Sequence, residues 1–249
     1  MNYVIEPNLP QSAVKIALIS ANEKEIEFKL KGCAVKTINI TAHNLLYNAV
    51  KFHSDMQVCH LGGDKIVCTD LSAGYCKELK RLGFKLIDSR MEVTEKYPKD
   101  IPVNSAFLGK NHLICGVKHT SPVLLEHAVR HDINILNTKQ GYAKCSTCVV
   151  NKNAIITSDK SIFGLAVKNG IDALLIRSGY ITLDGLNYGF IGGASGMIDK
   201  NIMAFTGDIS LHPDYVEIKA FLRKHSVDYV CLTDGKLRDI GGILPLICH

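Results

Sequence analysis

Five segments of the chain repeat one pattern, in which a basic or polar helix end is followed by a short stop and then by an apolar strand. The copies recur about every 50 residues, a period typical of architectures built from repeated units. We therefore expect five copies of one supersecondary unit to account for the chain. The segments are FKLKGCAVKTINI (28–40), ELKRLGFKLIDS (78–89), HAVRHDINILNT (127–138), AVKNGIDALLIRS (166–178) and FLRKHSVDYVCLT (221–233).

A β-hairpin is predicted before the helix in four of the five units. Each hairpin consists of two short runs rich in β-branched residues, joined by glycine, asparagine or other turn formers. The fifth hairpin has the longest turn. The units therefore have the order ββαβ. The paired runs are MQVCHL with KIVCTD, SAFLG with HLICGV, STCVV with AIIT, and YGFIGG with IMAFTGD.

The first unit lacks a first strand, and the end of the chain offers a spare one. We expect Ile243–Ile247 to pair with Val14–Ser20, which would close the units into a ring and remove exposed sheet edges. The predicted fold is a five-bladed α/β propeller with pseudo-fivefold symmetry, in a single domain over residues 1–249. An open doubly wound sheet would explain alternating strands and helices, but it would not produce the hairpins.

Composition and charge limit the classes of function that the sequence indicates. The chain is 47% hydrophobic, which is enough to bury a core, and its net charge of +5 is scattered without a basic run, so nucleic-acid binding is not indicated. Nine cysteines and no signal peptide at the start predict a reducing, cytoplasmic setting. No apolar run is long enough to span a membrane. The sequence does not indicate an oligomeric state.

The repeat resembles the pentein fold, which is shared by arginine and agmatine deiminases, dimethylarginine hydrolases and amidinotransferases. Like a pentein, the chain has five ββαβ units in 249 residues, with a C-terminal strand completing the first unit. The resemblance covers Val14 to Ile247. In detail the chain is similar to a bacterial branch of that superfamily without an assigned activity, and to no single enzyme in it. The resemblance implies a cationic guanidino or amidine substrate.

The resemblance also implies where the catalytic residues should lie, and this chain matches the expected motifs in part. In the enzymes a cysteine thiolate attacks the guanidinium carbon, and a histidine, commonly in His-x-Asp, acts as general acid and base. His53-Ser54-Asp55 matches that motif at the start of the second unit. Gly241-Gly242 matches the glycine run before the family's nucleophile, but Ile243–Pro245 stand where the cysteine should be, and Cys248 is a poor substitute.

Cys145 is a second candidate for the nucleophile. It begins the first strand of the fourth unit, two units after His53, which is the offset that the enzymes use. The repeat therefore predicts Cys145 as nucleophile, His53 as acid and base, and Asp55 as a group that holds a cationic substrate. Three further residues, expected to bind substrate, occupy comparable places in their own units: Asn104, Asn187 and Asp239.

Cys145-x-x-Cys148 has two other interpretations, a zinc site and a redox pair. A zinc site needs four ligands, and this pair supplies at most two. A thioredoxin-like redox pair should lie at the N-terminus of a helix, whereas this pair runs into a predicted strand. On a strand the two side chains would point to opposite faces, leaving Cys148 in the core and Cys145 exposed. We expect neither a metal nor a cofactor. Two functions remain open: a cysteine-dependent hydrolase or transferase, and a non-catalytic pentein that binds a small ligand or a macromolecular partner.

Overall fold

The computed structural model describes residues 1–249, which form five three-stranded sheets. In each sheet an antiparallel pair is followed by a parallel third strand. The sheets contain, in unit order, β15 (Leu244–Cys248), β1 (Val14–Ser20) and β2 (Lys36–Ile40); β3 (Val58–His60), β4 (Lys65–Cys68) and β5 (Lys85–Asp88); β6 (Ala106–Leu108), β7 (His112–Cys115) and β8 (Asn134–Asn137); β9 (Cys148–Asn151), β10 (Ala154–Thr157) and β11 (Asp172–Leu175); and β12 (Ser195–Asp199), β13 (Ile202–Phe205) and β14 (Asp228–Cys231).

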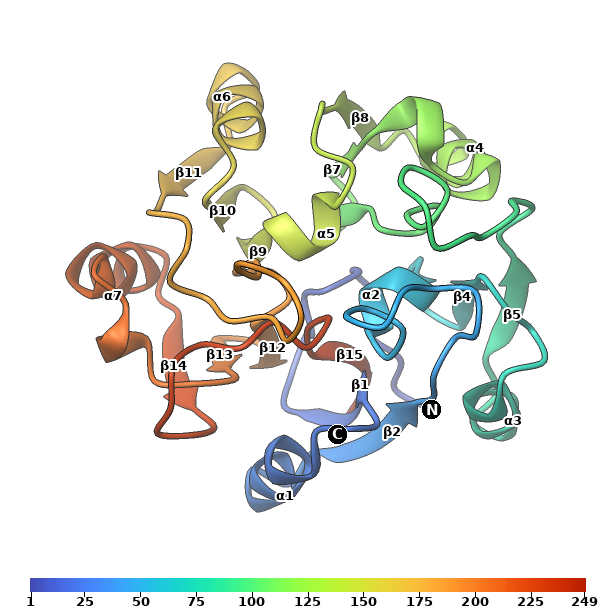
Figure 1. The fold of residues 1–249 in the computed structure, drawn as a ribbon, viewed down its shortest axis with the longest axis horizontal. Helices are drawn as coiled ribbons and strands as arrows, with labels where there is room; N and C mark the ends of the chain where they lie inside the picture. Colours follow the sequence, from blue (N-terminus) through green and yellow to red (C-terminus); the bar gives the residue numbers. More distant parts are fainter.

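Figure 1 shows the five units arranged around a common centre, with one longer helix of each unit on the outside. These outer helices are α1 (Lys24–Gly32), α3 (Gly74–Arg81), α4 (Pro122–Arg130), α6 (Lys160–Lys168) and α7 (Tyr215–Lys224). Two single-turn helices lie near the centre instead, α2 (Ser54–Gln57) and α5 (Ala143–Ser146). Two 3₁₀ turns complete the set, η1 (Val117–His119) and η2 (Ile209–Leu211).

The C-terminal strand completes the first unit, as the sequence predicts. β15 runs antiparallel to β1, with Leu244 opposite Leu18 and Pro245 opposite Ala17. Pro245 is tolerated because β15 is the edge strand of its sheet and one backbone N–H can be missing there. The two ends of the chain therefore meet in one sheet.

Neighbouring units share their hydrophobic cores. Because successive side chains of a strand point to opposite faces, one strand can contribute to two clusters. Both faces of the middle strands are buried in this way, which explains their nearly continuous apolar runs. Pairs that represent the five shared clusters are Leu18 with Ile66, Val67 with Phe107, Ile114 with Ile155, Ile156 with Phe205, and Ala204 with Ile19.

The fifth hairpin differs from its prediction. The structure begins its first strand, β12, at Ser195, so the prediction of a strand over YGFIGG (188–193) is wrong. Those residues instead belong to the connection between β11 and β12. Gly189 and Gly193 pack so tightly against Asp239 that neither has room for a side chain. Glycine is needed at these two positions for the close packing, and the residues do not form a strand.

None of the helices combines the length and the apolar composition that crossing a bilayer requires.

Candidate active site

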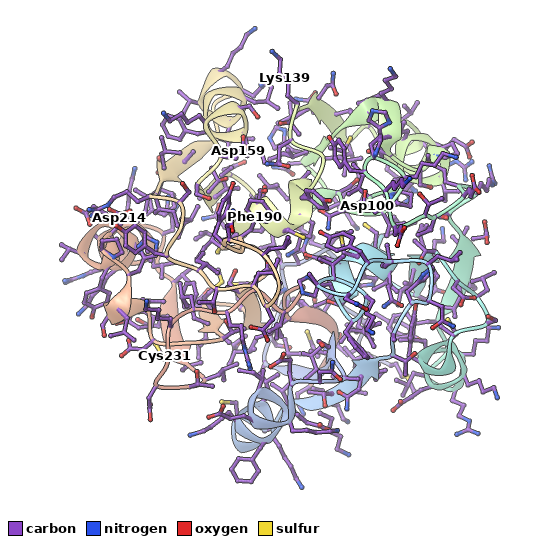
Figure 2. All side chains as sticks on the ribbon, in the orientation of Figure 1. Asp100, Lys139, Asp159, Phe190, Asp214 and Cys231 are labelled. Carbon is purple, nitrogen blue, oxygen red and sulfur yellow. The ribbon has the colours of Figure 1, made fainter.

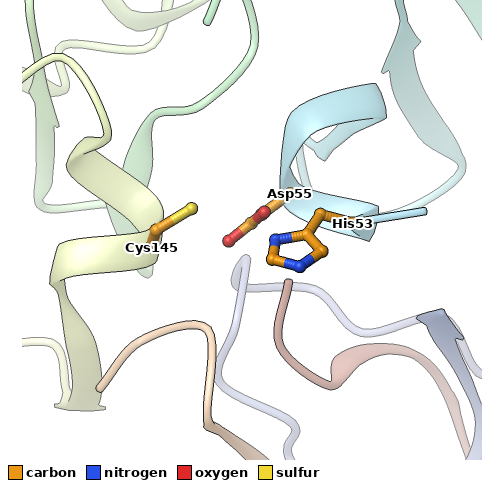
Figure 3. Close-up of side chains that lie close together, drawn as sticks. All are labelled: His53, Asp55 and Cys145. Carbon is orange, nitrogen blue, oxygen red and sulfur yellow. The ribbon is translucent and has the colours of Figure 1, made fainter. Parts of the chain in front are cut away.

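Two central helical turns bring a histidine, a carboxylate and a thiol together. His53 precedes α2 and Asp55 lies in its first turn, while Cys145 lies in α5. One ligand atom from each residue lies within 4.8 Å of the others. Figure 3 shows the Asp55 carboxylate between the Cys145 sulfur and the His53 ring. All three residues are buried, each with 3–4% of its surface exposed.

The helical turns correct the local structure expected at both motifs. The prediction that Cys145 begins a strand is wrong, because β9 starts only at Cys148. His53-Ser54-Asp55 likewise forms the turn before β3 and not the strand itself. The prediction that Cys145 is exposed is also wrong, since it is 3% exposed. Cys148 is in the core as expected, with its sulfur 3.7 Å from the sulfur of Met203.

Gly241 positions α2 beside the end of the chain. The Ser54 hydroxyl donates to the carbonyl of Gly241 at 2.7 Å, and the backbone N–H of Asp55 donates to the same carbonyl at 3.3 Å. Gly241 has a φ of +79°, and a Cβ at this position would lie 2.5 Å from Cα of His53. In this chain the glycine run therefore makes room for the His-x-Asp turn.

Asn104 holds the Cys145 thiol and the helical turn that carries it. Its amide oxygen accepts from the backbone N–H groups of Lys144 and Cys145, at 2.8 and 3.3 Å. Its amide nitrogen lies 3.0 Å from the sulfur of Cys145. Asn104 is 1% exposed and does not line the cavity described below. The structure therefore places it where it can orient α5, whereas the sequence predicted contact with substrate.

Asp239 is fixed beside the histidine. Its carboxylate accepts from the backbone N–H groups of Phe190, at 2.9 Å, and Gly241, at 3.1 Å. One of its oxygens lies 3.6 Å from Nδ1 of His53. Asp239 is 3% exposed, and its two backbone donors hold it in one orientation. It therefore lies in position to orient the imidazole.

Polar atoms in the centre of the site lack partners in the protein. Neither carboxylate oxygen of Asp55 has a hydrogen-bond partner, and Nδ1 of His53 has none either. Burial raises the pKa of Asp55 from 3.8 to about 6, although Lys144 and His53 oppose this shift. An unpaired buried carboxylate is costly, so the site is poised to accept a cation.

Burial also raises the pKa of the Cys145 thiol well above its ordinary value, and the carboxyl groups of Asp55 and Asp239 raise it further. A thiol is the weaker nucleophile, and its thiolate is the reactive form. A cation bound beside the carboxyl groups would favour the thiolate. In the free protein the electrostatics therefore favour the unreactive thiol.

A cavity of about 340 Å³ adjoins His53 and Cys145, whereas Asp55, like Asn104, does not line it. His53, Cys145 and Asp239 line it, and Asn187 lines its exposed rim. Figure 2 shows Phe190, another lining residue, close to the centre of the ring of units. The remaining walls are aromatic or aliphatic: Tyr47, Val50, Tyr142, Leu183, Leu186 and Tyr188.

A second, polar cavity of about 400 Å³ adjoins the first and shares His53, Leu183 and Asp239 with it. Arg238 and Glu23 form an ion pair in its wall. The histidine and Asp239 therefore lie between two spaces of different character.

Sequence reasoning missed most of the cavity wall. The aromatic residues come from connections between units, such as 41–53 and 176–194, where the repeat gives no register. Lys144 was also missed. Its ammonium donates to the carbonyl of Gly192 at 3.1 Å and opposes the rise that burial causes in the pKa of nearby Asp55.

His53, Asp55 and Cys145 also form a donor set that could hold a metal ion. Imidazole nitrogen, thiolate sulfur and carboxylate oxygen are all zinc ligands, and a catalytic zinc commonly has three protein ligands. This set differs from the Cys145/Cys148 pair considered from the sequence, because Cys148 points into the core.

The fold recurs in solved structures of guanidino-modifying enzymes. An inosamine-phosphate amidinotransferase from Streptomyces griseus superimposes with a TM-score of 0.60 at 10% identity, covering 98% of this chain and 96% of that chain. Agmatine deiminase from C. jejuni gives a TM-score of 0.56 at 10% identity, with 94% and 90% covered. A saxitoxin-pathway amidinotransferase from Microseira wollei gives 0.54 at 10% identity, with 92% and 91% covered.

These likenesses establish the pentein fold. At the level of sequence, no curated protein matches. A family model described as "Family of unknown function (DUF6873)" matches residues 18–244, which span all five units. The chain has the pentein fold and belongs to the DUF6873 family.

Proposed function

We propose that the protein is a cysteine-dependent hydrolase or transferase that acts on a guanidino or amidine compound. One observation carries the proposal: a buried cysteine, histidine and carboxylate lie within 4.8 Å of one another, both Asp55 oxygens are unpartnered, and the cysteine and histidine line a cavity. Cys145 is the nucleophile, His53 the general acid and base, and Asp55 pairs with the cation. Asp239 orients His53, and Asn187 contacts substrate at the rim.

The scaffold that we infer for this site is a single-domain, five-bladed propeller over residues 1–249. In such a ring, units two steps apart present their first strands to the same central space. His53 and Asp55 belong to the second unit and Cys145 to the fourth. The base and the nucleophile would then be two units apart, as in the pentein enzymes. Each would lie in a different unit of the chain from its counterpart in those enzymes.

Substrate binding would activate the site. A guanidinium is planar and remains protonated, and it pairs well with a carboxylate. Its charge beside Asp55 would lower the pKa of that carboxyl group and of Cys145. Cys145 then ionises when substrate is present, beside an Asp55 carboxylate that is already charged at neutral pH.

The chemical step follows from these positions. The Cys145 sulfur attacks the central guanidinium carbon, and His53 accepts the thiol proton. A carbon–nitrogen bond then breaks while His53 returns the proton to the leaving nitrogen. This leaves an S-amidino enzyme and releases ammonia or an amine. Water or an acceptor amine attacks the same carbon, His53 takes its proton, and the carbon–sulfur bond breaks with the proton returning to sulfur.

A pair of electrophiles tests the proposal. 2-Chloroacetamidine is a cation and 2-chloroacetamide is its neutral counterpart, and both alkylate a thiol with loss of chloride. We expect the cation to label Cys145 at least about tenfold faster at pH 7.5, because it pairs with the carboxyl groups. Peptide mass spectrometry locates the label, and agmatine should protect the site. The exposed thiol of Cys33 serves as an internal control, without this preference. Equal rates for the two reagents at Cys145 would contradict the proposal.

A non-catalytic pentein that binds a cationic ligand is the second candidate. Two observations favour it: the raised pKa of Cys145, and the apolar residues 243–245 where the family's nucleophile stands. Cation binding that survives Cys145→Ala, with no turnover of any guanidine by the wild type, would select this function.

A further inference from the structure

We propose that the substrate is a monosubstituted guanidinium whose substituent is apolar and carries no anionic group. This inference rests on the proposed function of Cys145 and extends it from a reaction class to a substrate class. The observation behind it is the contrast between the two parts of the first cavity. Its floor is acidic and polar, while its walls are aromatic and aliphatic.

The aromatic walls form one connected group. Phe190 stacks with Tyr142 at a centroid distance of 6.3 Å and an interplanar angle of 26°. Tyr188 meets the same phenylalanine edge-on, at 5.8 Å and 86°. Tyr47 completes the aromatic lining. Ring faces and edges contact apolar or aromatic groups favourably, so these walls fit a hydrocarbon substituent.

The cavity offers no positive charge to an anionic substituent. None of its lining residues is lysine or arginine. The Tyr142 hydroxyl donates to the Asp100 carboxylate at 2.6 Å, so its proton is not available to a ligand. A carboxylate or phosphate placed here would lose its water without gaining a lysine or arginine partner and would also face Asp239. The walls therefore select against anions.

The size and rim of the cavity limit the substituent. At about 340 Å³ it lies near the lower end of roughly 300–1,000 Å³ typical of ligand pockets, so it suits a guanidinium with one compact group. The rim residues Leu186 and Tyr188 are 48% and 43% exposed. They are the solvent-facing part of the wall, and a substituent that extends from the floor would contact them.

The residues that line the first cavity include no lysine or arginine. The neighbouring polar cavity is lined by one of each, Lys51 and Arg238. Both already have partners: Arg238 pairs with Glu23, and the Lys51 ammonium donates to the Asn48 side chain at 3.1 Å. An anionic substituent would have to turn past His53 and displace these partners. Preference for an anionic substrate would therefore indicate binding across both cavities.

Matched guanidines test the inference. 4-Phenylbutylguanidine and 5-guanidinopentanoate carry the same head group on chains of similar length, one ending in a ring and the other in a carboxylate. We expect kcat/KM to favour the phenyl compound by at least about 100-fold, mainly through KM. Calorimetric binding to Cys145→Ala should show the same order. Tyr188→Ala and Phe190→Leu should each reduce the preference by about tenfold. Leu211→Ala, an exposed apolar residue on η2, should leave it unchanged.

The outcomes separate the two proposals. Turnover that favours the carboxylate, or a preference that Tyr188→Ala and Phe190→Leu do not alter, would overturn the substrate class and leave the catalytic assignment intact. Tight binding of the phenyl compound without turnover would support the substrate class and overturn the catalytic assignment. If neither compound binds to Cys145→Ala, the substrate class is wrong.

Discussion

Replacing Cys145 with alanine should reduce guanidine turnover at least about 10³-fold, because the variant lacks the atom that forms the covalent intermediate. The measurement is release of ammonia, amine or urea from a panel of guanidines and amidines. The fold should survive, since Cys145 lies in a single-turn helix that Asn104 holds through backbone groups. Substrate should still bind, because Asp55 and Asp239 remain.

Cys148→Ala is the matched control. Cys148 lies three residues further on, is equally buried and contacts Met203, but it points away from the cavity. Its loss should lower the free energy of unfolding by about 1–2 kcal/mol and leave turnover per folded molecule unchanged.

Two results would contradict the assignment of Cys145. Activity that survives Cys145→Ala would exclude it as the nucleophile. Activity that disappears when the wild-type protein is treated with EDTA, and returns with zinc, would assign the same three donors to a metal. Activity unaffected by EDTA supports the thiol mechanism.

The architecture was largely predictable because each unit repeats its own local signals. The helix ends and third strands were found by a stop followed by an apolar run, as at Gly83 before β5 and Gly170 before β11. Pairing of β15 with β1 followed from counting strands. The starts of the units were less predictable. At Ala143–Ser146 a helical turn forms because Asn104, 41 residues before Cys145, accepts from its backbone, and no local pattern encodes that contact.

The site was predictable only where it follows the repeat. The two-unit offset was enough to place His53 and Cys145 in one cavity. The offset could not indicate that Asn104 would turn inward to hold the thiol, or that Asp239 would be fixed by Phe190 and Gly241. The bonds from Asn104 to Cys145 and from Phe190 to Asp239 join connections of different units. The aromatic walls depend on the same connections, which have no common length or register.

Asp55→Asn should stabilise the protein at neutral pH. The pKa of Asp55 is about 6 in the folded protein, against 3.8 ordinarily, so the folded state binds this proton more tightly than the unfolded state. The contribution of Asp55 to stability is therefore complete below pH 4 and is lost as pH rises through 6. Asparagine stays neutral and avoids this loss. A rise in pKa from 3.8 to about 6 corresponds to about 3 kcal/mol gained at pH 7.5 and almost nothing gained below pH 4.

Urea unfolding between pH 4 and 8 measures this difference, and urea is needed because guanidinium resembles the proposed ligand. Millimolar guanidinium chloride should raise the midpoint of the wild type and have much less effect on Asp55→Asn, since the carboxylate that pairs with the cation is gone. Asp234→Asn, at an exposed carboxyl group, should change neither result. Asp55→Asn should also reduce turnover, although it makes the fold more stable. If the substitution instead destabilises the protein at pH 7.5, Asp55 has a partner within the fold, and its carboxylate is not reserved for a substrate cation.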